Sequence, residues 1–202
     1  MLKLLPCLDS DEMADSRRRD LDIPRSIARA LGESAVAAAT AGHYFFDGVR
    51  RIDWSREVAA ARAARVSLPP EAPLPSPASP PFEATRVQVT NETTFLASRR
   101  LVDAGLRPLA LNFANGIHPG GGFLTGSRAQ EEALCRSSAL YSTLAGDPMY
   151  AAHRQRSRPD STDWAILSPD VPVFRTDDGT ELEETWLLSF LTCAAPVAKS
   201  IG

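Results

Sequence analysis

Two hydrophobic patterns divide the chain, and a run of prolines separates them. Before the prolines, an alanine-rich segment over residues 24–42 begins with Pro24 and ends with Gly42, which is the arrangement expected of a helix. A second helix is predicted over about residues 55–66. Seven prolines follow within residues 68–82. Because proline fits neither a helix interior nor a central strand, this segment is predicted to be an extended connector.

After the prolines, strand patterns alternate with helical patterns. The predicted strands cover residues 85–90, 107–115, 164–175 and 185–195, with Pro169 and Pro172 interrupting the third. A helix is predicted between the first two strands, because apolar residues recur at helical spacing before Gly105. Strands that alternate with helices predict an α/β layer fold.

The segment after the second strand predicts a further helix. Ser127 and Gln130 have the three-residue offset of a capping box, so this helix is expected to begin at Ser127. Its first turn then contains Glu131 and Glu132. Its later apolar face is expected to carry Leu134, Tyr141 and Leu144.

Composition narrows the class of protein. A chain of 202 residues with 44% hydrophobic residues is long enough for one principal core, and a net charge of -3 provides no broad field for nucleic-acid phosphates. DNA binding is therefore not expected. Cys7, Cys135 and Cys193 are odd in number and far apart, which favours reduced thiols over a disulfide framework or a zinc site. No apolar run is long enough to span a bilayer, and the first residues turn acidic too soon for a secretory signal, so a cytoplasmic location is expected.

Three consecutive glycines lie between the second predicted strand and the acidic helix start. Gly120, Gly121 and Gly122 place a loop without side chains at the carboxyl edge of the sheet, where ligands of open α/β sheets bind. Main-chain amides in such a loop can bind anionic or sugar oxygens. Taken alone, the triplet also fits a tight turn, and the glutamates also fit an ordinary acidic first turn of a helix.

The combination of these motifs is more specific than any one of them. Asn115, HPGGG at 118–122 and QEE at 130–132, with seven residues between the glycines and Gln130, resemble the signature of the microbial poly(ADP-ribose) glycohydrolases. The resemblance extends over most of the chain. It implies a macrodomain-like, three-layer α/β/α fold over residues 82–202, preceded by a helical extension and connector over residues 1–81.

The resemblance also implies roles for individual residues. Glu132 would be the catalytic acid and base, and Glu131 and Asn115 would hydrogen-bond the ribose. Gly120, Gly121 and Gly122 would wrap that ribose, and Gln130 would complete the substrate-binding set. The implied reaction is hydrolysis of ribose–ribose O-glycosidic bonds in poly(ADP-ribose), releasing ADP-ribose. No metal or cofactor is implied, and the expected partner is poly(ADP-ribose) or an ADP-ribosylated protein, with no membrane.

The chemistry of a glycosidic bond fits one protonatable carboxyl group beside the sugar. The leaving oxygen must be protonated while positive charge develops at the anomeric carbon. Glu131 and Glu132 are adjacent on a helix and diverge by about 100°, so they are expected to have different roles. A helix N-terminus lowers the pKa of a carboxyl group, whereas a general acid needs a pKa near the working pH. Desolvation, the second carboxylate or a bound diphosphate could each oppose the helix.

The other charged and titratable residues are interpreted as ordinary. His43, His118 and His153 are scattered and are assigned to surface or loop positions. The basic run of residues 17–19 is interpreted as solvated rather than as a phosphate site, and the same interpretation is applied to Arg128 and Arg136.

The last residues depart from the family pattern. Family members continue past an AAPN-like strand end to a second glycine-rich loop, which holds the diphosphate, and an adjacent aromatic residue. Here the sequence reads CAAPVAKSIG, with Val197 where asparagine is expected. The C-terminal part of the domain is therefore expected to be incomplete. Two alternatives to an active hydrolase follow: an ADP-ribose-binding module without turnover, and an inactive fragment with incompletely covered apolar surface.

Overall fold

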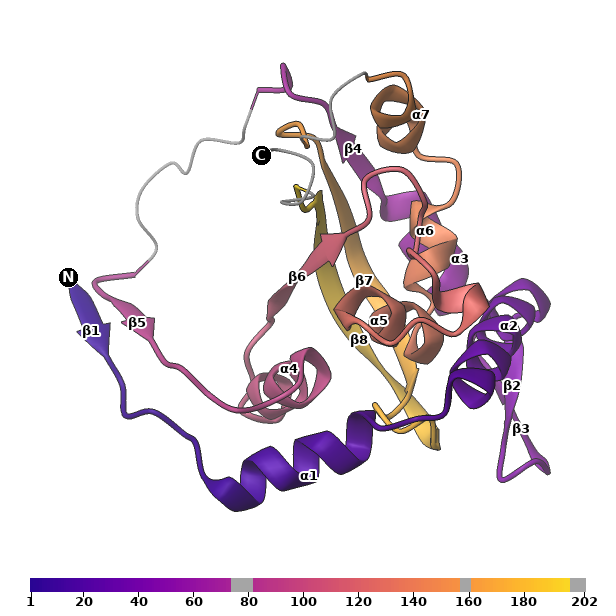
Figure 1. Ribbon diagram of the computed structural model, residues 1–202, viewed down its shortest axis with the longest axis horizontal. Helices are drawn as coiled ribbons and strands as arrows, with labels where there is room; N and C mark the ends of the chain where they lie inside the picture. The colour runs from indigo at the N-terminus through magenta and orange to yellow at the C-terminus, as the bar shows by residue number, and fades with distance from the viewer. Residues whose placement is uncertain (74–81, 157–160, 197–202) are drawn as a thin grey trace.

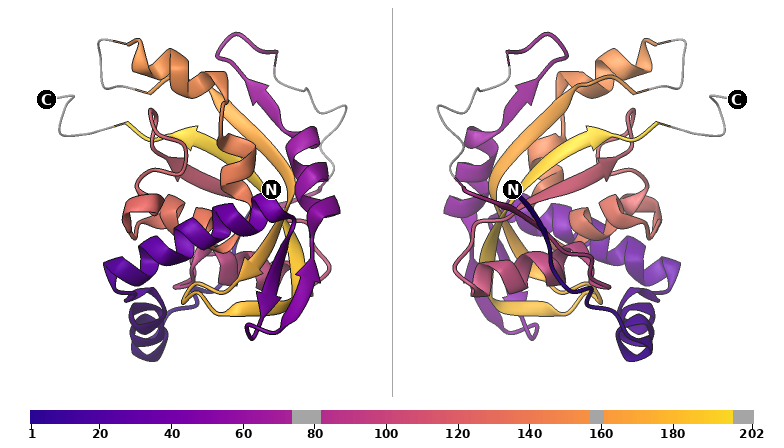
Figure 2. Two further views of the ribbon diagram at one scale, coloured as in Figure 1. Left: turned by 90° about the vertical axis from the view of Figure 1, so that its right-hand side faces the viewer. Right: turned by 90° about the vertical axis from the view of Figure 1, so that its left-hand side faces the viewer.

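A four-stranded mixed sheet forms the centre of the computed structural model, which describes residues 1–73, 82–156 and 161–196 (Figure 1). The strands are β4 (Val66–Leu68), β7 (Ala165–Arg175), β8 (Glu181–Ala194) and β6 (Leu109–Ala114), in that spatial order. β6 runs parallel to β8, and the other neighbours are antiparallel. The long β7–β8 hairpin twists along the length of the body, as the two views of Figure 2 show.

Helices cover one face of this sheet. The elements that pack there are α2 (Arg25–Ala41), α3 (Ser55–Ala64), the 3-10 turn η1 (Phe123–Thr125), α5 (Gln130–Ser137) and α6 (Leu140–Leu144). Buried and more exposed residues alternate along β6 and β8. On the buried face, Ala110 and Asn112 of β6 pair with Phe190 and Thr192 of β8. The Asn112 amide donates a hydrogen bond to the Thr192 hydroxyl at 3.2 Å. Each of these polar groups thus has a partner inside an apolar layer.

Aromatic side chains fill the core between the sheet and the N-terminal elements. Trp54 and Phe174 are fully buried, with ring centroids 4.6 Å apart, and Tyr44 packs against both. The Trp54 indole N–H donates to the Ala38 carbonyl, and the Tyr44 hydroxyl donates to the Leu182 carbonyl. Each ring therefore buries its apolar surface while its polar atom keeps a partner.

The opposite face of the sheet is more exposed. Leu109, Leu111 and Phe113 on β6 are 54%, 40% and 61% exposed, and Leu187 on β8 is 45% exposed. On the helix-covered face, by contrast, α4 (Thr94–Asp103) contributes Phe95, which packs edge-on against Trp186 and Phe190. The described residues thus leave a strip of apolar side chains along β6 in contact with solvent.

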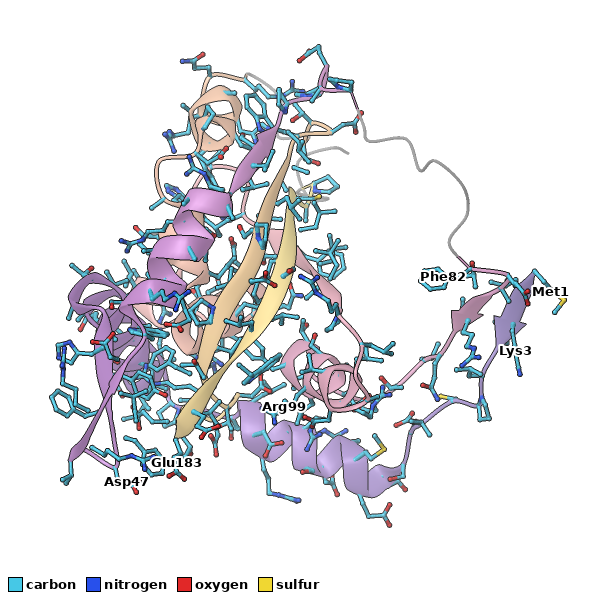
Figure 3. All side chains as sticks on the ribbon, turned by 180° about the vertical axis from the view of Figure 1, so that it is seen from behind. Met1, Lys3, Asp47, Phe82, Arg99 and Glu183 are labelled. Carbon is cyan, nitrogen blue, oxygen red and sulfur yellow. The ribbon has the colours of Figure 1, made fainter. Side chains whose placement is uncertain are left out.

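The remaining elements extend the body. A hairpin of β2 (His43–Phe46) and β3 (Arg50–Asp53) connects α2 to α3, and α7 (Pro148–Arg154) follows α6. The N-terminal part contains β1 (Leu2–Leu4), α1 (Asp11–Leu21) and β5 (Thr85–Val87), with β1 and β5 parallel. Met1, Lys3 and Phe82 mark this ribbon in Figure 3, well away from Glu183 in β8. Among the described residues, no helix is long and apolar enough to cross a membrane.

Several sequence predictions agree with these elements. The predicted helix over residues 24–42 is α2, which has Pro24 as its N-cap and Gly42 in the left-handed conformation at its end. The predicted α/β fold is confirmed. In the strand predicted over 164–175, Pro169 lies in a register shift of β7 against β8 between Ser168 and Val171, and Pro172 stays paired with Leu187.

Two predictions about elements are wrong in detail. The helix expected to begin at Ser127 begins at Gln130, with Ala129 as its N-cap and no side-chain cap, and it ends at Ser137 before the separate helix α6. The Ser127 N–H instead donates to the Gly122 carbonyl, so Ser127 belongs to the turn that precedes the helix. The strand expected at 85–90 is shortened to Thr85–Val87, is exposed, and pairs with β1 outside the central sheet.

Residues on both sides of the predicted boundary between 81 and 82 share one core. β4 pairs with β7, and Trp54 and Val58 belong to the same buried cluster as Phe190. The division into 1–81 and 82–202 stays a prediction and does not separate two cores. Most of the proline connector and Val197 lie outside the described residues.

Candidate active site

The glycine loop, defined here as residues 115–129, connects the end of β6 to the start of α5. Asn115 is the first residue of this loop, and its side-chain Oδ1 accepts hydrogen bonds from the backbone N–H groups of Ile117 and His118, both at 2.9 Å. This local bonding turns the chain away from the sheet directly after the strand ends. The Asn115 Oδ1 atom is thus used inside the loop. Within the described part of the chain, its Nδ2 group makes no hydrogen bond, so it is the end of the side chain available to a ligand.

Glu131 connects the two ends of the glycine turn. Its Oε2 accepts from the Asn115 N–H at 2.7 Å, and its Oε1 accepts from the Gly120 N–H at 3.1 Å. The side chain belongs to a residue that is 3% exposed. Two backbone donors that would otherwise lack partners therefore fix the loop to the first turn of α5.

Glu132 faces the middle of the same turn. Its Oε1 accepts from the Gly122 N–H at 2.9 Å. Gly121 has a φ of +57°, and a methyl group added there would collide with Glu132 Oε1 and approach Glu131 Oε2 to 3.0 Å. Glycine is therefore required at this position, both for the backbone conformation and for the space occupied by the carboxylates. In the structure the Glu132 carboxylate thus lies beside residues 121 and 122, and its catalytic role stays a prediction.

Burial changes the acidity of the first glutamate. Desolvation raises the pKa of Glu131 to about 7, while the hydrogen bond from the Asn115 N–H lowers it and the neighbouring charge of Glu132 raises it further. Desolvation is the largest of these effects, so the site contains a carboxyl group that exchanges its proton near neutral pH. At Glu131, burial therefore outweighs the effect of the helix N-terminus that the sequence predicts.

Gln130 does not face the glycine turn. Its Oε1 accepts from the Phe113 N–H at 2.9 Å, and its Nε2 donates to the Leu111 carbonyl at 2.7 Å and to the Thr94 hydroxyl at 3.2 Å. The side chain thus bonds the free edge of β6 as a neighbouring strand would. The sequence assigns Gln130 to substrate binding. In the structure its amide is occupied by protein groups, and it holds β6 against α5 instead.

His153 and Arg154 on α7 support the loop from the other side, which the sequence does not indicate. His153 is 7% exposed and its ring nitrogens contact the Gly116 carbonyl at 3.0 Å and the Thr162 hydroxyl at 2.7 Å. The Arg154 guanidinium donates to the Ile117 carbonyl at 2.7 Å. His153 is buried although a surface or loop position was predicted for it, and no periodicity or motif around α7 identifies this contact.

The arginines interpreted as solvated differ in their surroundings. Arg128 is exposed and bonds the Ile23 carbonyl and Asp22. Arg136, one helical turn after Glu132, is instead 1% exposed. The interpretation of Arg136 as a solvated charge is therefore wrong. Among the described residues, no group of three or more His, Cys, Asp or Glu side chains is placed to hold a metal ion.

The fold and this loop define a macrodomain-like α/β domain with a glycine turn held between two glutamates. Residues 32–176 match the family model of the microbial-type PARG catalytic domain, where PARG is poly(ADP-ribose) glycohydrolase. The chain belongs to this family. A comparison with curated protein sequences finds no match.

Solved structures agree with this family. The chain is 40% identical to PARG from Thermomonospora curvata, with a TM-score of 0.79, covering 88% of this chain and 67% of that one. The Thermomonospora enzyme bound to the inhibitor ADP-HPD gives 39% identity, a TM-score of 0.78, and coverage of 88% and 66%. PARG from Deinococcus radiodurans in complex with ADP-ribose is 38% identical, with a TM-score of 0.61 and coverage of 71% and 60%. The chain thus spans about two thirds or less of the length of these relatives.

Proposed function

We propose that this chain hydrolyses the ribose–ribose O-glycosidic bonds of poly(ADP-ribose) and releases ADP-ribose. The observation that supports it most directly is the position of the Glu132 carboxylate, bonded to the Gly122 N–H and facing the bare backbone of Gly121. A sugar seated on that backbone would lie beside the Glu132 carboxyl group. Membership of the PARG family and the PARG structures with ADP-ribose and ADP-HPD favour the same ligand chemistry.

In the proposed mechanism, Glu132 acts first as an acid and then as a base. Its carboxylic acid donates a proton to the leaving ribose oxygen as the bond to the anomeric carbon breaks. The resulting carboxylate then removes a proton from the water that attacks the anomeric carbon. Atoms balance over the two steps, because one water is consumed and Glu132 regains its proton.

Glu131 and Asn115 would prepare the site for this chemistry. Glu131 fixes the Asn115 and Gly120 backbone groups, so the loop is held in shape before a ligand arrives. The Nδ2 group of Asn115 is then the available donor for a ribose hydroxyl. The loop that fixes the sugar and the carboxyl that reacts are therefore parts of one hydrogen-bonded unit.

Turnover and binding together test the proposal. The purified chain is incubated with poly(ADP-ribose) at enzyme excess, and free ADP-ribose is measured by chromatography, while calorimetry measures ADP-ribose binding. Release by the native chain and its loss in Glu132→Gln support hydrolysis. Binding without release would select the ADP-ribose-binding alternative. Absence of both in a chain that unfolds cooperatively would reject both functions, and a chain without a cooperative transition would favour the inactive fragment.

The proposed substrate also sets the expected surroundings of the protein. We propose poly(ADP-ribose) or an ADP-ribosylated protein as its partner, without direct DNA binding. A cytoplasmic location stays a prediction. The free, widely spaced cysteines, of which Cys135 is buried and Cys7 is exposed, fit this prediction.

A further inference from the structure

Arg136 is a buried cation without a direct partner. It lies in the last turn of α5, is 1% exposed, and its Nε, Nη1 and Nη2 atoms are all buried without a hydrogen bond among the described residues. A guanidinium group stays protonated in proteins and loses much hydration when it is buried. Buried polar atoms normally find a partner, so this charge calls for a compensating interaction over a longer range.

Two buried carboxyl groups provide that compensation. Burial lowers the pKa of Arg136, and the charges of Asp177 and Glu132 oppose this effect. Glu132 lies four residues earlier on the same helix, a spacing that places both side chains on one face. Asp177 follows β7, is 7% exposed, and accepts a hydrogen bond from the Thr93 hydroxyl at 2.6 Å.

Other charged groups around this cluster act more weakly. Arg128 lowers the pKa of Arg136, and the Cys135 thiol raises it. Burial raises the pKa of Asp177, the hydrogen bond from Thr93 and the charges of Arg136 and Arg17 lower it, and Asp20 raises it. Glu131 precedes Glu132 in the chain, and burial raises its pKa to about 7. Burial also raises the pKa of Tyr150, and the charge of Glu131 raises it further. From β7, Arg175 donates to the Arg136 carbonyl and pairs with Glu181, so its own charge is already matched.

We propose that Arg136 is a positioning residue, whose buried charge attracts the Glu132 carboxylate and helps to hold it at the Gly122 N–H, with Asp177 as a second counter-charge. This inference rests on the proposed function of Glu132. It assigns Arg136 no contact with substrate. Because Arg136 is attracted by both carboxyl groups, a change at Asp177 reaches the glutamate pair through it.

A purely structural role for Arg136 has a different signature. A basic residue in the last turn of a helix also stabilises the helix through its dipole, and its stem fills space. Loss of those contributions lowers the melting temperature. It does not raise the titration midpoints of Glu131 and Glu132 when a cation is removed and lower them when an anion is removed. The ionisation of the pair is therefore the informative measurement.

The experiment follows the glutamate carboxyl groups by NMR. The full chain is labelled with ¹³C-glutamate, the signals of the pair are assigned with Glu131→Gln and Glu132→Gln, and titrations are recorded from acid to alkaline pH. The variants are Arg136→Met, Arg136→Lys and Asp177→Asn. Arg29→Met is the matched control, because it removes the same charge from a side chain that is 63% exposed on α2. Because Glu131 and Glu132 titrate as a coupled pair, the apparent titration midpoints of the pair are compared rather than a pKa for each residue.

Opposite shifts are expected from the two charge removals. Loss of the cation in Arg136→Met raises the upper midpoint of the pair by about one pH unit, and loss of the anion in Asp177→Asn lowers it. Arg136→Lys keeps the native value, and Arg29→Met leaves it unchanged. An unchanged midpoint in a folded Arg136→Met chain overturns the inference. If that variant does not fold, Asp177→Asn decides alone, and an unchanged or raised midpoint overturns it.

This measurement separates the inference from the proposed function. The titration needs no turnover. A native chain that releases no ADP-ribose would count against hydrolysis, and the NMR titration would still decide whether Arg136 acts on the glutamates. Where turnover is present, the pH profile of kcat is expected to move in the same direction as the midpoint in each variant.

Discussion

The backbone N–H of Gly122 donates a hydrogen bond to the Glu132 carboxylate at 2.9 Å, so the proposed acid is located by the same main chain that would hold the sugar. Glu131 repeats this arrangement one residue earlier, with two backbone donors instead of one. The loop and the first turn of α5 are therefore one mechanical unit. A substitution in either part is expected to change the position of the other.

Glu132→Gln separates proton transfer from positioning. The glutamine oxygen can still accept from the Gly122 N–H, but the amide cannot donate and recover a proton at neutral pH. We expect kcat for ADP-ribose release to fall by roughly 100- to 10,000-fold, with little change in melting temperature. Glu33→Gln, at an exposed position on α2, is the matched control and should keep native turnover. Equal activity in Glu132→Gln and native chains would exclude Glu132 as the acid.

Glu131 makes the stability of the chain depend on pH. A carboxyl group whose pKa is raised by folding keeps its proton in the folded chain where the unfolded chain has lost it, so stability falls as pH rises. With a pKa of about 7 in the folded state and 4.5 as the ordinary value, the fall occurs between these values. Its size is roughly 3 to 4 kcal/mol, since each pKa unit corresponds to about 1.4 kcal/mol.

Glu131→Gln provides the comparison for this prediction. Urea unfolding at pH 4.5 and pH 8 gives the free energy of unfolding of both chains. The native chain should lose more stability than the variant over that interval, because the glutamine does not titrate. A native chain and a variant with the same pH dependence would show that Glu131 has an ordinary acidity in the folded state.

Local signals were sufficient to predict the elements whose ends depend on one or two residues. Pro24 and Gly42 set the bounds of α2 through their own backbone preferences. The glycine triplet and the two glutamates were close enough in sequence to indicate a shared site, since only the short loop between them has to fold back. That part of the site is local, and the family resemblance identified it.

Tertiary contacts decided the features that the sequence did not reveal. Ser127 and Gln130 have the spacing of a capping box, yet Ser127 closes the turn at Gly122 and Gln130 bonds the edge of β6. His153 is buried because α7 returns to Gly116, which lies 37 residues away in the chain. The burial of Arg136 depends likewise on several elements packed around α5. None of these partners is adjacent in sequence, so no spacing rule could select them.

Gly121→Ala tests the space in front of the carboxylates. The alanine must adopt a φ of +57° and its methyl group collides with Glu132 Oε1. We expect turnover to fall at least about 100-fold, because displacing a reacting group by an ångström has effects of that size. ADP-ribose binding, measured by calorimetry, should weaken as well.

Gly105→Ala supplies the control for backbone strain. Gly105 has a φ of +77°, and an added methyl group there meets nothing within 4 Å. Both variants should lose about 1–2 kcal/mol of stability for the left-handed conformation, measured by urea unfolding. Only Gly121→Ala should also lose turnover. If the two variants keep the same activity, the collision with Glu132 has no consequence for catalysis.

Asn115 has two functions that two substitutions can separate. Its Oδ1 accepts from the Ile117 and His118 N–H groups, and its Nδ2 is available to a ribose hydroxyl. Asn115→Asp keeps the acceptor and removes the donor, so the loop should keep its shape. ADP-ribose affinity should fall by about tenfold or more, the equivalent of about 1.4 kcal/mol. Asn115→Ala removes both groups and should also lower the free energy of unfolding by about 1 kcal/mol.

The comparison between these two variants decides which end of the side chain binds ligand. Calorimetry with ADP-ribose and urea unfolding are carried out on the native chain and both variants. Native affinity in Asn115→Asp would place the ribose contact elsewhere and limit Asn115 to shaping the loop. A stable Asn115→Asp chain whose weakened binding persists at high salt would instead favour an amide contact to the sugar, because salt screens the repulsion between the added carboxylate and the diphosphate.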